Sequence, residues 1–210
     1  MEEHRGKMKN TKFVILMLFL GILGAKKAAA LPAFNFYAGF ANAWTSTSTT
    51  DVGYHVGWDV SADVNWNIRV LLPHSASRIR SSTASILISP GFRGQFLDLA
   101  ASNWLADGSR YRAWSAFGLG PEIGVGLNIS HFGISRGQTF LLSTALLGNV
   151  AHYTQTSLYN AYMSWLIKAS WDLELKHGWA VSTSFPVEFA YRADGRSIVS
   201  GLGIGVKYAF

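Results

Sequence analysis

The sequence predicts an all-β protein, an eight-stranded antiparallel transmembrane β-barrel with up-and-down meander order. Two observations predict it: an unbroken alternation of apolar and polar residues from Val52 to Val70, and seven further segments of the same kind. Side chains of a β-strand point to opposite faces in turn. Soluble strands rarely alternate for this long, whereas strands that cross a membrane do.

Residues 1–30 form the expected leader, and residues 31–210 form the expected barrel. A basic stretch precedes the apolar run Phe13–Gly24, which has 12 residues, and three alanines then offer a cleavage site before Leu31. This order is typical of a secretory signal peptide. A membrane-spanning helix is the alternative, but such a helix needs about 20 apolar residues.

Most of the net charge of +6 belongs to the leader. Residues 1–30 hold six of the 18 basic and two of the 12 acidic residues, which leaves 12 and 10, or +2, for residues 31–210. No basic block remains there, so nucleic acid is not an expected partner. The chain has no cysteine, which excludes a disulfide framework and a lipid-anchored cysteine after the leader.

Eight segments show the alternation expected of strands. They cover residues 34–45, 52–70, 84–97, 113–130, 139–152, 161–176, 179–192 and 197–210, and the fifth is apolar on both faces. In chain order, the apolar faces of the others are marked by Phe34, Phe36 and Phe40; Tyr54, Trp58 and Trp66; Ile86, Ile88 and Phe92; Phe117, Ile123 and Val125; Met163, Trp165 and Trp171; Trp179, Phe185 and Phe189; and Leu202, Ile204 and Val206. The connections are rich in turn formers, with a tight reversal at His177-Gly178 and a hairpin signal at Asp194-Gly195.

Pro90, Pro121 and Pro186 lie inside three of these segments, where a proline removes a hydrogen bond from the sheet. A hairpin centred on residues 105–106 would place Pro90 opposite Pro121. A non-hydrogen-bonded pair of an antiparallel ladder would tolerate both. We therefore predict that these two prolines face each other.

The polar faces of the segments predict the content of the interior. A sheet inside a membrane has to close, because an open edge would leave backbone groups unpaired in hydrocarbon. Eight strands enclose a space that side chains just fill. The expected interior charges, five basic and six acidic, are Asp59, Asp63, Arg69, Arg93, Glu122, Lys168, Asp172, Glu174, Glu188, Arg192 and Lys207. Because buried charges need partners, we predict a salt-bridged interior with little free pore.

The end of the chain carries a family resemblance. Its last residues, Gly205-Val206-Lys207-Tyr208-Ala209-Phe210, have aromatics at Tyr208 and Phe210 and a glycine at Gly205. This ending resembles the C-terminal assembly signal of bacterial outer-membrane proteins, although Gly203 stands where a polar residue is usual. With its leader and eight segments, the whole chain resembles the small eight-stranded outer-membrane barrels (OmpW, OmpX and the OmpA membrane domain), and the glycine pattern of the last segment is OmpW-like.

This resemblance implies a location in the outer membrane, with outer-membrane lipid and the barrel-assembly machinery as partners. It also implies a lumen that passes small hydrophobic solutes, which leave laterally. A surface adhesin that binds a host ligand and a purely structural barrel are the alternative roles. We expect a monomer with both termini in the periplasm, because an even number of strands returns the chain to the side where it started.

The loop expected at residues 98–112 is unusually apolar for an outer surface, with Leu99, Trp104 and Leu105. It is a candidate cap for the barrel mouth, or a candidate contact for a hydrophobic solute, a host ligand or an envelope partner, and the alternative is that it packs on its own strands. The aromatics expected at the two membrane interfaces are Trp44, Trp66, Trp114, Tyr153, Tyr162, Trp179, Tyr191, Tyr208 and Phe210.

The sequence predicts neither an enzyme nor a cofactor. It has no nucleophile elbow, no His-Glu-x-x-His and no phosphate loop, and its five histidines after the leader have no metal-ligand spacing. The paired glycines between Gly118 and Gly126 lie in a strand without a following helix, so they are small interior residues instead of a nucleotide site. Two alternatives stay open: a lipid A-modifying barrel, for which His152 and Ser157 are the nearest candidates, and a soluble sandwich or lipocalin-like barrel with inverted faces.

Overall fold

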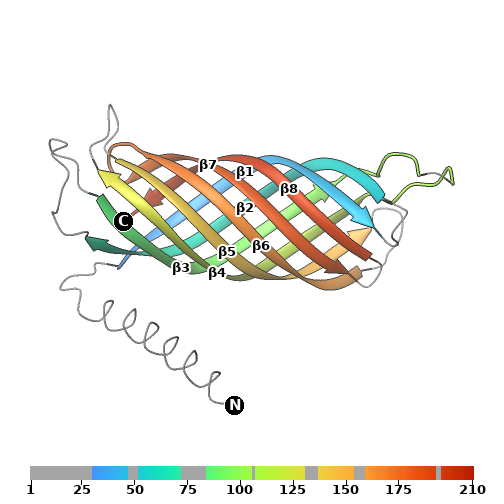
Figure 1. The fold of residues 1–210 in the computed structure, drawn as a ribbon, viewed down its shortest axis with the longest axis horizontal. Coiled ribbons are helices and arrows are strands. Elements are labelled where there is room, and N and C mark those ends of the chain that lie inside the picture. The colour runs from blue at the N-terminus through green and yellow to red at the C-terminus, as the bar shows by residue number, and fades with distance from the viewer. Residues whose placement is uncertain are drawn as a thin grey trace, which may run out of the picture.

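The computed structural model describes residues 30–46, 52–71, 84–105, 107–130, 137–153, 159–192 and 195–210. Its strands are β1 (Ala30–Ser46), β2 (Val52–Leu71), β3 (Ala84–Leu99), β4 (Trp114–Ser130), β5 (Gly137–Tyr153), β6 (Tyr159–Glu174), β7 (Trp179–Arg192) and β8 (Gly195–Ala209). Each strand pairs antiparallel with the next, and β8 pairs with β1, so the sheet closes into a barrel (Figure 1). The predicted eight-stranded meander is confirmed. The expected leader lies outside the described residues, except for Ala30.

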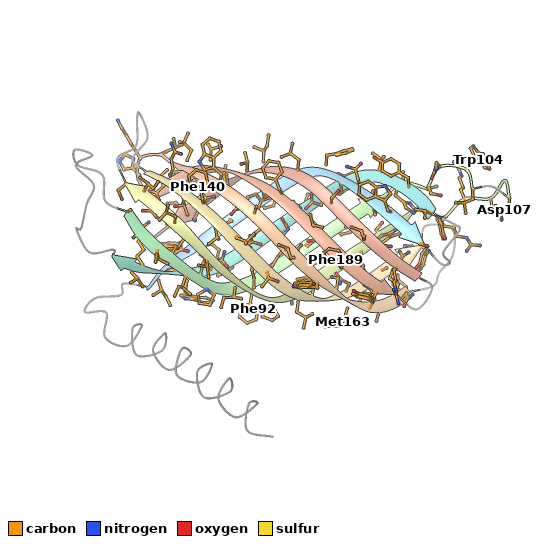
Figure 2. All side chains as sticks on the ribbon, in the orientation of Figure 1. Phe92, Trp104, Asp107, Phe140, Met163 and Phe189 are labelled. Atoms are coloured by element: carbon orange, nitrogen blue, oxygen red, sulfur yellow. The ribbon has the colours of Figure 1, made fainter. Side chains whose placement is uncertain are left out.

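The two faces of the wall alternate as the sequence predicts. In β2, Trp58 and Trp66 are 46% and 42% exposed, whereas Asp59 and Asp63 are 6% and 0% exposed. Side chains such as Phe92 project outward from the wall in Figure 2. The apolar face therefore looks out and the polar face looks in, which contradicts the alternative of a soluble barrel with an apolar core. No helix in the described ranges is both long enough and apolar enough to cross a membrane.

Strand ends differ from the predicted segments by a few residues. Strand β1 already pairs with β2 at Ala30, opposite Ile68, four residues before the first phenylalanine that signals alternation. Strand β6 ends at Glu174 because a turn follows it, in which the Leu175 N–H donates to the Trp179 carbonyl at 2.7 Å. The predicted reversal is confirmed there, since His177 and Gly178 have φ values of 60° and 78°.

The predicted register of the β3–β4 hairpin is wrong by two residues. Pro90 lies opposite Ile123, and Pro121 lies opposite Phe92. The two prolines are therefore diagonal neighbours and do not face each other. Pro90 and Pro121 do not need to face each other, because each of them is tolerated at its own break in the sheet.

Each proline interrupts only one of the two ladders of its strand. The β2–β3 ladder is broken beside Pro90, the β4–β5 ladder beside Pro121, and the β7–β8 ladder beside Pro186. The opposite ladder of each strand runs through without a break. A residue in a sheet directs its N–H to a single neighbouring strand, so a proline costs a hydrogen bond on one side only.

Candidate functional site

The barrel has two ends that we name by what they carry. The terminal end carries the start of β1 and the end of β8, where the Phe210 N–H donates to the Pro32 carbonyl at 3.1 Å. The loop end carries the segment 100–113 between β3 and β4 (Figure 1). Of the eleven predicted interior charges, nine are buried, and Arg69 and Glu174 are half-buried near the terminal end.

Four of the buried charges meet at the middle of the barrel and form what we call the central tetrad: Asp63, Arg93, Glu122 and Lys168. Asp63 accepts hydrogen bonds from Arg93 Nη1 at 3.0 Å and from Lys168 Nζ. Lys168 Nζ also lies 2.9 Å from Glu122 Oε1. None of the four is more than 4% exposed. Two acids and two bases from four different strands therefore neutralise one another across the interior.

The terminal end holds a second group of charges around a cavity. Lys207 Nζ lies 2.6 Å from Asp172 Oδ2, and Arg69 Nη2 lies 3.6 Å from Glu174 Oε1. Beside these pairs is a cavity of about 240 Å³, whose lining includes Arg69, Glu174, Lys207, Leu87, Trp179 and Phe210. This cavity lies at the terminal end, and the central tetrad separates it from the loop end.

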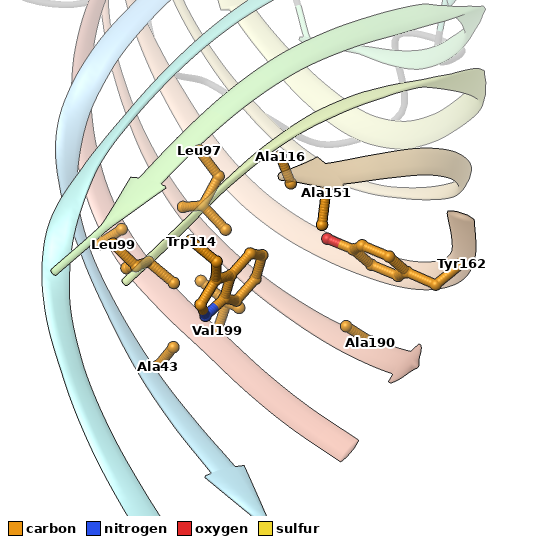
Figure 3. Packing of buried hydrophobic residues seen from close by; sticks show 10 residues of the cluster. Ala43, Leu97, Leu99, Trp114, Ala116, Ala151, Tyr162, Ala190 and Val199 are labelled. Atoms are coloured by element: carbon orange, nitrogen blue, oxygen red, sulfur yellow. The ribbon is translucent and has the colours of Figure 1, made fainter. Parts of the chain in front are cut away.

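The loop end is filled by an apolar cluster that the sequence did not predict. The cluster consists of Ala41, Ala43, Leu97, Leu99, Trp114, Ala116, Ala151, Tyr162, Ala190 and Val199. Trp114 is 1% exposed and lies between Leu97 and Val199 (Figure 3). The Arg192 guanidinium stacks on the Trp114 ring at 4.6 Å from its centroid. A large aromatic with a cation on its face closes this end of the interior.

The expected place of three aromatics at a membrane interface is therefore wrong. Trp114 and Tyr162 are buried inside, and half-buried Tyr153 packs against the same cluster. The sequence contained the signal, since Trp114 is an even number of residues from Glu122, and Tyr162 is an even number from Lys168. Residues at even spacing lie on the same face of a strand, so both aromatics should have been assigned to the interior. The prediction instead assigned them to the interface because they lie near strand ends.

The loop prediction needs one correction. Leu99 is the last residue of β3, and it is 1% exposed because its side chain belongs to the apolar cluster inside the barrel. Trp104 is 69% exposed and Leu105 is half-buried. The Arg110 guanidinium lies 5.0 Å from the centroid of the Trp104 ring. Of the three predicted contact residues, Trp104 is the one that is exposed, and Arg110 lies over its ring.

Backbone hydrogen bonds hold this loop against the wall. The Ala100 N–H donates to the Val56 carbonyl at 3.0 Å, and the Asn103 N–H donates to the Tyr54 carbonyl at 3.1 Å. The segment after β3 therefore continues alongside the first residues of β2. His55, which is fully buried, adds a contact of 2.7 Å from Nδ1 to the Ala100 carbonyl oxygen. Trp104 is thus presented by an ordered segment.

The tip of the loop is a compact turn. Gly108 has a φ of 80°, and its N–H donates to the Leu105 carbonyl at 3.0 Å. Asp107 Oδ1 accepts hydrogen bonds from the Ser109 hydroxyl at 2.5 Å and from the Ser109 N–H at 2.8 Å. These two bonds lower the pKa of Asp107 from its ordinary value, so its carboxylate stays ionised and keeps the turn intact in mild acid.

The residues of the expected assembly signal lie along the outer and inner faces of β8 and its end. Phe210 is 61% exposed, and its ring centroid lies 5.7 Å from that of Phe34 and 4.8 Å from that of Tyr208. Gly205 faces the interior, where an added Cβ would lie 2.7 Å from the Tyr37 ring. The absence of a side chain at Gly205 therefore makes room for Tyr37, which lies under the Lys168 ammonium.

The candidate catalytic and metal-binding residues are scattered. The His152 ring centroid lies 5.0 Å from that of the exposed Tyr159, with the two rings tilted to each other. Ser157 lies outside the described residues, as do His74 and His131. Across the described ranges, no three His, Cys, Asp or Glu side chains come together as a metal site would require.

Comparison with known proteins adds a likeness in fold. No protein-family model matches the chain, and no curated protein matches it. Among solved structures, Neisserial surface protein A (NspA) is similar with a TM-score of 0.52 and 12% identity, over 85% of this chain and 99% of that one. Ail, the attachment invasion locus protein of Yersinia pestis, has a TM-score of 0.34 at 11% identity over 84% and 98%. The complex of Ail with the heparin analogue sucrose octasulfate has a TM-score of 0.36 and 11% identity, over 84% of this chain and 99% of that one. At such identities, the NspA likeness shows the fold alone.

Proposed function

We propose that this chain is a non-enzymatic, integral outer-membrane protein, with a closed barrel that presents the segment 100–112 as a contact surface outside the cell. The exposed apolar side chains around the barrel support the membrane location. Val125, Leu142 and Ile204 are 58%, 61% and 64% exposed, each on a different strand. A soluble monomer rarely exposes such a continuous apolar surface, whereas hydrocarbon accepts it without cost.

Strand length supports the proposed orientation. The strands have between 14 and 20 residues, and roughly 9–11 residues suffice for a tilted strand to cross a bilayer. The surplus projects beyond the hydrocarbon on one side. We place it at the loop end, because barrels of this class have short periplasmic turns and longer outer loops. The terminal end then faces the periplasm.

The observation that carries the proposed role is the closed middle of the barrel. Arg93 and Lys168 are each 1% exposed, which supports an interior that the central tetrad fills at this level. Trp114 and its neighbours fill the loop end above the tetrad. With the interior occupied, the ordered outer loop is the part of the molecule that remains available for recognition. Exposed tryptophan and arginine are the residues most often decisive in binding surfaces.

Substitution of Trp104 by alanine tests this role. Adhesion of proteoliposomes that carry the protein to host-cell layers is expected to fall roughly tenfold or more, because a central tryptophan of a contact surface dominates its affinity. The melting temperature is expected to stay unchanged, since the ring is exposed. Tyr159→Ala is the matched control, because Tyr159 is 72% exposed at the same end but lies outside the loop. Equal loss of adhesion in both variants would contradict a role specific to the loop.

A narrow channel for small hydrophobic solutes, as the OmpW-like ending implies, is the second candidate. The cavity of about 240 Å³ at the terminal end favours it, because its lining mixes apolar and charged side chains. In this case, the central tetrad has to rearrange before a solute can pass beyond the cavity.

Planar-bilayer recordings separate the two candidates. Refolded protein is expected to give no steady conductance, because ions would have to displace the central tetrad from its buried pairs. A variant with the outer loop shortened between residues 103 and 110 serves as the control, and it is also expected to stay closed, since the barrier lies in the middle of the barrel. Regular conductance steps from the unmodified protein would instead favour the channel.

A further inference from the structure

The cavity of about 240 Å³ at the terminal end has cationic and apolar side chains next to each other in its lining. Arg69 lies opposite Leu87 on the neighbouring strand, and Lys207 lies opposite Ala180. Leu87 and Ala180 are both buried, so they belong to the interior wall. Each of the two cations therefore has a buried apolar residue beside it, an arrangement that suits a ligand with one charged and one apolar part.

The two acids of this end already have hydrogen-bond donors. Glu174 Oε1 accepts hydrogen bonds from Asn128 Nδ2 at 2.7 Å and from the Thr139 hydroxyl at 3.3 Å. Asp172 accepts one from the Ser182 hydroxyl at 2.7 Å in addition to the bond from its lysine partner. A cationic ligand would have to compete with these bonds, so the acids do not favour one.

Arg69 differs from the two acids because its donors are mostly unused. Its Nη2 lies 3.6 Å from Glu174 Oε1, which is longer than a hydrogen bond, and its Nε has no acceptor within the described part of the chain. The side chain is 40% exposed and belongs to the lining of the cavity. The guanidinium can therefore turn toward a ligand without breaking a hydrogen bond. Its planar set of N–H groups matches the geometry of a carboxylate.

We propose that this cavity binds a small monocarboxylate with an apolar body, whose carboxylate pairs with Arg69 and whose body packs on Leu87 and Ala180. The space corresponds to about eight water molecules at roughly 30 Å³ each, so a ligand of about eight to ten non-hydrogen atoms fits. A dianion such as a phosphate ester is disfavoured, because Glu174 and Asp172 lie at the same end. The site requires neither adhesion by the loop nor passage beyond the central tetrad, so the tests of those roles do not decide it.

The test is the binding of para-fluorobenzoate to the refolded, full-length barrel in lipid nanodiscs, measured by fluorine NMR with empty nanodiscs as the blank. A ligand of this size is expected to bind with a dissociation constant of about a millimolar. The amide para-fluorobenzamide has nearly the same shape but no charge, and it is expected to bind roughly tenfold more weakly. Acetate is expected to displace the probe roughly tenfold less effectively than benzoate, because it lacks the apolar body.

Arg69→Met is expected to weaken binding of the acid roughly tenfold and to leave binding of the amide unchanged. Arg196→Met is the matched control, because it removes an exposed arginine at the loop end, and it is expected to bind the acid normally. Ala180→Leu fills part of the cavity and is expected to weaken binding of both probes.

Three results overturn the proposal: equal binding of the acid and the amide by the unmodified protein, unchanged binding of the acid by Arg69→Met, or a signal no larger than that of empty nanodiscs. Displacement by acetate as effective as that by benzoate also overturns it, since the site would then select a charge without an apolar body.

Discussion

Lys168→Met is expected to destabilise the barrel by about 3–5 kcal/mol, the cost typical of removing one partner from a buried ion pair. Lys168 is 1% exposed and contacts both Asp63 and Glu122. Without the ammonium, Glu122 retains the Ser143 hydroxyl as its hydrogen-bond donor, and Asp63 retains Arg93. Two carboxylates then share a single nearby positive charge in an interior that water does not reach.

Urea unfolding of the refolded protein, followed by the folded and unfolded bands of an unheated gel, measures this loss. Arg69→Met is the matched control, because it also removes a cation from an ion pair but at a half-exposed place near the terminal end. The side chains of Arg69 and Glu174 are 40% and 27% exposed, so this variant is expected to cost at most about 1 kcal/mol. Equal costs for the two variants would show that the central tetrad contributes no more than a surface pair.

Deletion of Phe210 is expected to remove most of the folded protein from the outer membrane of expressing cells, while the purified variant still refolds in detergent. In the structure, Phe210 makes ring contacts with Phe34 and Tyr208, whose loss costs about 1–3 kcal/mol. A loss of this size leaves the isolated barrel folded. The larger effect in cells follows from our proposal that the barrel-assembly machinery recognises Gly205, Tyr208 and Phe210.

The measurement is the heat-modifiable band in the detergent-insoluble membrane fraction, compared with total protein. Trp179→Ala is the matched control, since Trp179 is 50% exposed near the same end and its ring centroid lies 4.9 Å from that of Tyr208, yet it lies in β7. It is expected to lose similar stability and to assemble normally. Normal assembly of the Phe210 deletion would contradict the assembly signal. Absence of the unmodified protein from the membrane fraction would contradict the proposed location.

The sequence alone was sufficient for the faces of the strands and for closure of the sheet. A period of two places Trp58 outside and Asp63 inside whatever the neighbouring strand does. Register is different, because a slip of two residues keeps every side chain on its own face. The hydrophobic pattern therefore cannot distinguish Pro90 opposite Pro121 from the observed Pro90 opposite Ile123.

The sequence also did not predict which charged side chains pair across the interior. Asp63 on β2 and Lys168 on β6 are 105 residues apart, and only the stagger and diameter of the closed barrel bring them to the same level. The sequence predicted which charges would be inside, but not that four would form a neutral group while Asp59 and Glu188 would not pair. The apolar loop end was missed for another reason, since Leu99 was assigned to a loop although its parity matches Arg93.

The contact between Asp63 and Lys168 is expected to make closure of the barrel cooperative. Adjacent strands can zip together one hairpin at a time, but a bond across the hollow forms only once the cylinder is complete. Before closure, the charged side chains have no partners across the interior, so they are more stable in water than buried in an incomplete sheet. The ion pair between Asp63 and Lys168 therefore favours the closed barrel over sheets that are only partly closed. It stabilises the pairing of β1 with β8 although both of its residues lie on other strands.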